Sequence, residues 1–134
     1  MCILDRQIPS DPALVTPLVL RTMEFLRAQE IVEPENSNKV GVCLSEALQN
    51  AVTHGNRRDF NKKVALRVCV TDTDCRFMVT DQGTGFEWRA VQGGGRGGIE
   101  EESGYGLLVI AHYMDTVEFH DCGRTIVMIK GTSR

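Results

Sequence analysis

The 134-residue chain has no run of about 20 apolar residues, the length that a helix needs to cross a membrane. Its first residues lack both the cationic and the apolar segment of a secretory signal. Acidic residues outnumber basic ones by 18 to 15, a net charge of −3, which argues against a protein that neutralises a nucleic-acid backbone. We therefore expect a cytoplasmic protein that binds neither membrane nor nucleic acid directly.

The chain also lacks paired cysteines at close spacing. Its five cysteines are odd in number and contain no C-x-x-C pair, so the sequence gives little support to a metal site or a disulfide framework. We expect packing or surface residues in a reducing cytosol. They are Cys2, Cys43, Cys69, Cys75 and Cys122.

What is present is a balanced composition, with 42% hydrophobic and 25% charged residues, which is typical of one soluble domain spanning residues 1–134. Three segments carry apolar residues at helical spacing. The first follows Ser10-Asp11-Pro12, with Thr16 as an alternative cap. The second runs from about Lys39 to His54, after a polar interruption at 33–38, and the third begins near Leu107.

Alternating apolar residues predict five strands. They are expected at residues 1–8 as an edge strand, from Lys63 to the turn at Asp72-Thr73-Asp74, and over Cys75–Asp81, Thr116–His120 and Thr125–Lys130. The pattern predicts an α+β fold: a two-layer α/β sandwich in which about three helices cover one face of a mostly antiparallel sheet.

Glycine is concentrated in one stretch, because nine of the 13 glycines lie between Gly83 and Gly106. This predicts a flexible loop set into a packed domain. Gly93–Gly98 does not match a P-loop, since the lysine and hydroxyl are missing. We interpret it as a lid whose Arg96 approaches phosphates, and a loop without such a role stays open as the alternative.

Three polar residues form a row on the second predicted helix. At about 100° per residue, Glu46, Asn50 and His54 are each displaced by about 40° from the last and flank the apolar stripe. An amide oxygen at Asn50 suits a hard cation such as Mg²⁺. The carboxylate of Glu46 suits a group that orients or deprotonates a hydroxyl. An ordinary amphipathic helix is the alternative.

The expected strand Cys75–Asp81 ends in a carboxylate that should point inward. Strand alternation puts Asp81 on the face of Phe77 and Val79. A carboxylate buried without a partner is costly, and the exocyclic amino group of adenine is one suitable donor. Gly83 and Gly85 let the backbone approach a flat ring or a phosphate. A strand end followed by a glycine turn is the alternative.

A third motif, Ser103–Leu107, stands just before the last apolar helical pattern. Small residues at a helix start expose amide hydrogens, and the helix dipole favours an anion there.

These motifs occur in a fixed order: Glu46–Gly55, then Asp81-x-Gly83-x-Gly85-Phe86, then Gly104-x-Gly106-Leu107. In this order they resemble the N box and the two glycine boxes of GHKL-type ATP-binding domains. The chain is most similar to the small anti-sigma-factor serine kinases of bacterial partner-switching systems, from about residue 8 to Lys130.

The resemblance implies a role for each matching position. Glu46 corresponds to the catalytic carboxylate that activates a serine hydroxyl, and Asn50 to the residue that holds Mg²⁺ against the ATP phosphates. Asp81 corresponds to the residue that accepts a hydrogen bond from the adenine amino group, and Gly83 and Gly85 to residues that line the base. The further ATP-binding positions are His54, the backbone amides of Gly104, Gly106 and Leu107, and the supporting threonine, Thr125.

The resemblance also implies partners. The protein is expected to phosphorylate an anti-sigma-factor antagonist, to sequester a sigma factor, and to form a homodimer for which the edge near residues 1–8 is a candidate surface. Tyr105 stands where relatives often carry arginine, and Arg124 separates Gly123 from Thr125. Two alternatives stay open: an ATP-binding switch without significant phosphotransfer, and a related domain that acts on a different regulator.

Overall fold

The computed structural model describes residues 1–85 and 101–132. Its strands agree with the predicted ones to within a residue or two. They are β1 (Cys2–Pro9), β2 (Lys63–Val70), β3 (Asp74–Thr80), β4 (Thr116–His120) and β5 (Thr125–Gly131). The predicted lid around Gly93–Gly98, with Arg96, lies outside the described residues.

Three α-helices accompany the strands: α1 (Val15–Ala28), α2 (Pro34–Asn50) and α4 (Glu101–Tyr113). A π-helical turn, Ala51–Gly55, continues α2. A short 3-10 turn, Pro12–Leu14, precedes α1 and is capped by the Asp11 side chain, which accepts a hydrogen bond from Ala13 N at 3.0 Å. Thr16 therefore lies inside α1 and does not cap it.

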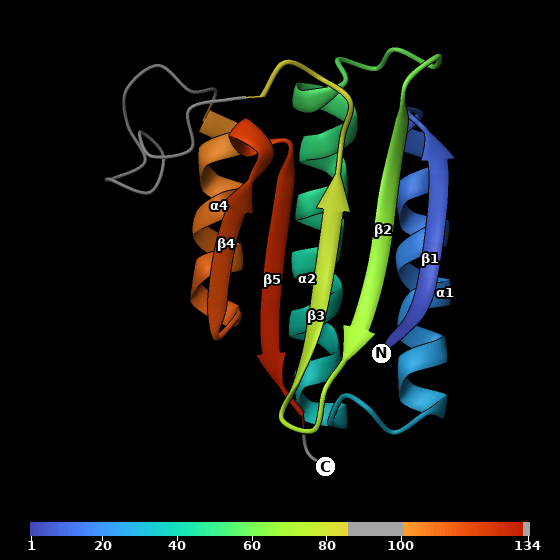
Figure 1. The fold of residues 1–134 in the computed structure, drawn as a ribbon, viewed down its shortest axis with the longest axis vertical. Helices are drawn as coiled ribbons and strands as arrows, with labels where there is room; N and C mark the ends of the chain where they lie inside the picture. Colours follow the sequence, from blue (N-terminus) through green and yellow to red (C-terminus); the bar gives the residue numbers. More distant parts are fainter. Residues whose placement is uncertain (86–100, 133–134) are drawn as a thin grey trace.

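The five strands form one antiparallel sheet in the order β1-β2-β3-β5-β4. Figure 1 shows this sheet in front, with all three helices behind it. The predicted α+β two-layer sandwich is confirmed. The core fills the space between the layers, and its largest fully buried side chains include Phe77, Leu26, Leu44, Leu48, Leu66, Ile110 and Met128.

The starts of two helices differ from the prediction. Helix α2 begins at Pro34 and not near Lys39, because proline at the first helical position has no N–H to leave unpaired and its φ is already helical. Helix α4 begins at Glu101, so Gly104 and Gly106 lie within it and not before it. Two glycines lower intrinsic helix propensity, which hides this start in the sequence.

Among the described residues, no helix combines the length and apolar character needed to cross a bilayer.

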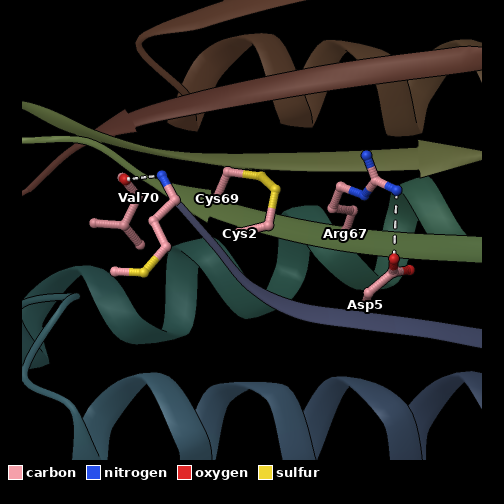
Figure 2. The surroundings of a disulfide bond; sticks show 6 residues. Cys2, Asp5, Arg67, Cys69 and Val70 are labelled. Atoms are coloured by element: carbon pink, nitrogen blue, oxygen red, sulfur yellow. Dashed lines mark hydrogen bonds and ion pairs between the residues drawn. A yellow bond between two sulfur atoms is a disulfide. The ribbon is translucent and has the colours of Figure 1, made fainter.

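Cys2 and Cys69 form a disulfide between β1 and β2, which corrects the expectation of unpaired cysteines (Figure 2). The pairing depends on register: the two residues are directly opposed, next to a bulge at Ile3. On the same edge, Arg67 forms an ion pair with Asp5 at 3.3 Å. These contacts fasten the first half of the edge strand to β2.

The other three cysteines are free thiols. Burial raises the pKa of the Cys43 thiol to about 11 and that of the Cys75 thiol to about 12, so both stay protonated near neutral pH. Cys122 is exposed.

We predict that dithiothreitol lowers the stability of the wild-type protein by about 2–4 kcal/mol, because the disulfide closes a long loop in the unfolded chain. The sequence separation of the two cysteines is 67 residues. Urea unfolding with and without reductant measures this. The Cys69→Ala variant is the control and should not respond to reductant. An unchanged wild-type midpoint under reductant would show that the disulfide contributes nothing to stability.

Candidate functional site

A cavity of about 430 Å³ lies where the end of α2, the end of β3 and the start of β5 meet, at the upper end of Figure 1. Its volume falls in the range of small-molecule pockets. Apolar side chains from both layers form much of its wall: Val79, Phe119 and Ile126 from the sheet, Ala47 and Ala51 from the α2 side, and Leu107 from α4. The polar residues on the wall are Asn50, Thr53, His54, Arg57, Asp81, Thr84 and Arg124.

Asp81 is the buried carboxylate of this cavity, with an exposed fraction of 9%. It follows β3 on the same face as Val79, as alternation predicts. One of its oxygens, Oδ1, accepts a hydrogen bond from Gly83 N at 2.8 Å. Burial raises the pKa of Asp81, while the Gly83 N–H and the Arg124 charge act in the opposite direction. The cavity wall therefore includes a buried carboxylate that can accept a hydrogen bond from a ligand.

The segment Asp81–Gly85, here called the carboxylate loop, packs on its neighbours through backbone. A Cβ on Gly83 would overlap the carbonyl oxygen of Gly55, and a Cβ on Gly55 would overlap the Asp81 carboxylate. Gly85 has a φ of +89°, which other residues rarely adopt. Glycines thus let the loop lie directly against the end of the π-helical turn.

Asn56 links the carboxylate loop to the end of the π-helical turn, and its exposed fraction is only 1%. Its Nδ2 donates to Ser10 Oγ at 2.8 Å and to the Lys63 carbonyl at 2.9 Å. Its Oδ1 accepts from Gln82 N at 2.7 Å. Asn56 therefore joins the exit of the π-helical turn, the end of β1 and the carboxylate loop. Sequence reasoning did not identify Asn56, because it begins a polar segment that is typical of a loop.

Glu46 and Asn50 converge on one residue of α4. A Cβ built on Gly106 would lie 2.5 Å from Glu46 Oε2 and 3.5 Å from Asn50 Nδ2. The Asn50 Nδ2 is buried without a hydrogen-bond partner. An unpaired buried donor costs about 1–3 kcal/mol, so a ligand that supplies an acceptor relieves that cost.

Asn50 can supply an oxygen ligand to a magnesium ion. Mg²⁺ takes oxygen ligands, keeps several waters, and usually uses one or two protein groups plus substrate phosphates. The Asn50 amide, turned to present Oδ1, fits this chemistry. Within residues 1–85 and 101–132, no cluster of three or more His, Cys, Asp or Glu side chains would hold a metal by itself. The remaining ligands would therefore have to come from phosphates and water.

The structure brings most of the predicted site residues to this end of the molecule. Asn50, His54, Asp81, Gly85 and Leu107 line the cavity. Glu46 and Gly83 lie behind the lining, against Gly106 and Gly55 respectively.

Thr125 is not brought into the cavity. Its Oγ1 lies 3.0 Å from Thr80 Oγ1, and Thr80 precedes Asp81 on a strand whose side chains alternate between faces. Thr125 therefore lies on the sheet face opposite the cavity, and Ile126 from β5 lines the wall instead.

The backbone amides that were predicted to bind phosphate at a helix start lie within α4 instead. Gly104, Gly106 and Leu107 follow the first three residues of α4. Amides beyond the first turn are used by the helix's own hydrogen bonds. They are therefore not available to a phosphate unless the start of α4 unwinds.

Several wall residues were missed by sequence reasoning. Phe119 lies on a correctly predicted strand, but only the pairing of β4 with β5 shows that it reaches the cavity. Arg57 has a φ of 53° just after the π-helical turn, and no local pattern predicts its place there. Arg124 was noted only as an insertion between Gly123 and Thr125.

A cavity between the helices and the antiparallel sheet, with a buried carboxylate at one wall and an amide–carboxylate pair beside it, has the features of a small-molecule binding site. The chain matches the histidine kinase-like ATPase domain over residues 8–130 and belongs to that family. The membership confirms the predicted GHKL-type domain and implies ATP as its ligand. No curated protein matches the chain. The narrower likeness to anti-sigma-factor kinases stays a prediction.

We predict that Gly83→Ala weakens ATP binding about tenfold or more, equivalent to about 1.4 kcal/mol. The new Cβ meets the backbone of Gly55, so the carboxylate loop must shift and carry Asp81 with it. Isothermal titration calorimetry with ATP measures the change.

Gly41→Ala is the matched control. A Cβ on Gly41 would lie 3.6 Å from Met23 Cγ, an ordinary contact, and alanine is favoured over glycine inside a helix by about 0.5–1 kcal/mol. This variant should bind ATP like the wild type and unfold at a higher temperature. Equal ATP affinities for the two variants would mean that the Gly55–Gly83 crossing does not position the site.

Proposed function

We propose that the protein is an ATP-dependent protein-serine kinase that also acts as an anti-sigma factor. It would phosphorylate an anti-sigma-factor antagonist and sequester a sigma factor. The observation that carries the kinase proposal is the convergence of Glu46 and Asn50 on Gly106, beside a cavity that also holds Asp81. A domain that only bound the nucleobase would not need a carboxylate at that position.

Each residue has a defined task in this proposal. The adenine ring packs between apolar walls that include Val79 and Ile126, and its exocyclic amino group donates to the Asp81 carboxylate. Asn50 lies on the same cavity wall, where its unpaired Nδ2 would donate to a phosphate oxygen or, with the amide turned, its Oδ1 would hold Mg²⁺. When bound, Mg²⁺ neutralises phosphate charge.

Glu46 is the general base of the proposed reaction. Its carboxylate accepts the proton of the acceptor serine as the serine oxygen bonds to the γ-phosphorus. The bond from that phosphorus to the β–γ bridging oxygen breaks, and ADP leaves. Most of the catalytic effect would come from positioning, because the protein forms no covalent bond with the phosphoryl group.

The partners and the setting are part of the proposal. The resemblance supplies the antagonist and the sigma factor, and a cytoplasmic location follows from them. Strand β1 is an edge of the sheet and pairs only on its β2 side within the described residues, which supports a homodimer through this edge.

An ATP-binding switch without phosphotransfer is the second candidate. It is favoured by the enclosure of the Gly106 and Leu107 amides within α4, and by the position of Glu46 outside the cavity lining. In that state Glu46 does not line the cavity. A related kinase acting on a regulator unconnected with sigma factors is compatible with the same site.

We predict that Glu46→Gln retains ATP affinity but transfers phosphate about 10²–10⁴ times more slowly, because glutamine cannot accept the hydroxyl proton. The assay uses ATP labelled at the γ-phosphate and antagonist proteins encoded near this chain's gene. Glu24→Gln, an exposed position on α1, is the control and should leave the transfer rate unchanged. Transfer at the wild-type rate in Glu46→Gln excludes the base role. Binding without transfer in the wild type, with every antagonist tried, supports the switch.

A further inference from the structure

Arg124 holds the carboxylate loop at two points. Its main-chain oxygen accepts a hydrogen bond from Asp81 N at 2.9 Å. Its side-chain Nε donates to the Gly83 carbonyl at 2.7 Å. The same side chain lines the cavity. One residue therefore fixes both Asp81 and the glycine whose N–H binds the Asp81 carboxylate.

The guanidinium of Arg124 is itself held from the other side. Its Nη1 donates to the Asp121 carbonyl at 3.3 Å and forms an ion pair with Asp121 Oδ1 at 3.1 Å. A planar guanidinium makes these bonds in different directions at once, which a lysine ammonium on its flexible stem does not reproduce. Arg124 thus links the turn before β5 to the carboxylate loop.

The charge of Arg124 also acts on Asp81. Burial raises the pKa of Asp81, the positive charges of Arg124 and Lys62 lower it, and the negative charge of Asp121 raises it. His54 and Arg57 are the other ionisable side chains on the cavity wall. The Arg124 side chain is also hydrogen-bonded to the carboxylate loop itself, through the Gly83 carbonyl.

We propose that Arg124 is a positioning residue for base selection. It holds the carboxylate loop so that Asp81 faces the base as an ionised hydrogen-bond acceptor. The site then binds a base with an amino group at that point more tightly than a base with a carbonyl there. The inference rests on the ATP site proposed above and assigns it a determinant of specificity.

The chemistry of two purines makes this selection measurable. Hypoxanthine carries a carbonyl where adenine carries the exocyclic amino group, so an ionised Asp81 would face a second acceptor and lose its hydrogen bond. A protonated Asp81 would donate a hydrogen bond to that carbonyl, so the site would also bind hypoxanthine. Selection is therefore present above the pKa of Asp81 and is lost as the pH falls through it. Removing the Arg124 charge moves that loss to higher pH.

The test compares the affinities of ATP and inosine triphosphate by calorimetry from about pH 5 to about pH 8. In Arg124→Gln we expect the ATP-to-inosine-triphosphate affinity ratio to fall about tenfold, and to decline at a higher pH than in the wild type. Arg124→Lys keeps the charge without the planar fork and should give an intermediate ratio with the wild-type pH profile. Arg76→Gln, a change in the exposed Arg76–Asp74 pair at the start of β3, is the control and should leave the ratio unchanged.

An unchanged affinity ratio in both Arg124 variants overturns the inference, and equal losses of affinity for the two nucleotides, which a merely structural role would produce, are one form of that result. Thermal unfolding checks that each variant folds. If Arg124→Gln does not fold, the affinity ratio of Arg124→Lys alone decides the question. A wild type that does not distinguish the two nucleotides contradicts the adenine site itself, and so separates failure of the proposed function from failure of the Arg124 role.

Discussion

The structure of the site depends on the contact between Asp81, Gly55 and Gly83, in which a buried carboxylate is enclosed by backbone. Charge in an apolar cavity is costly unless polar groups face it, and here the Gly83 N–H supplies the closest one. Glycine at 55 and 83 is required by space, since a Cβ at either position would overlap the opposing segment. The protein therefore keeps an acceptor that is only partly compensated, and a ligand with a matching donor gains from completing it.

Other parts of the fold serve this contact. The π-helical turn after α2 places Gly55 against the Asp81 carboxylate. Asn56 then joins the turn to the carboxylate loop, because its Oδ1 accepts a hydrogen bond from Gln82 N. Through Ser10, Asn56 also connects the end of β1 with the same loop. The site is thus connected to the edge strand, and the Cys2–Cys69 disulfide joins that strand to β2 at its far end.

The sequence predicts what local patterns encode. Period-two alternation located β2 and β3, and it also predicted that Asp81 faces inward. Features that depend on distant segments were not predictable: the partners Ser10 and Asn56 are 46 residues apart, and Cys2 and Cys69 are separated by 67. The start of α4 was misplaced because glycines suggest a loop, whereas at Gly106 the absence of a side chain is what allows the helix to pack against Glu46. Thr125 was assigned to the site by the family resemblance, but its contact with Thr80 places it on the opposite face.

The most direct measurement of the central claim compares the wild-type affinity for ATP with that for purine riboside triphosphate, which lacks only the exocyclic amino group. If the Asp81 carboxylate reads that group, the analogue binds about tenfold or more weakly, since a hydrogen bond to a charged group contributes about 1.5–3 kcal/mol. Equal affinities for the two nucleotides would contradict the account.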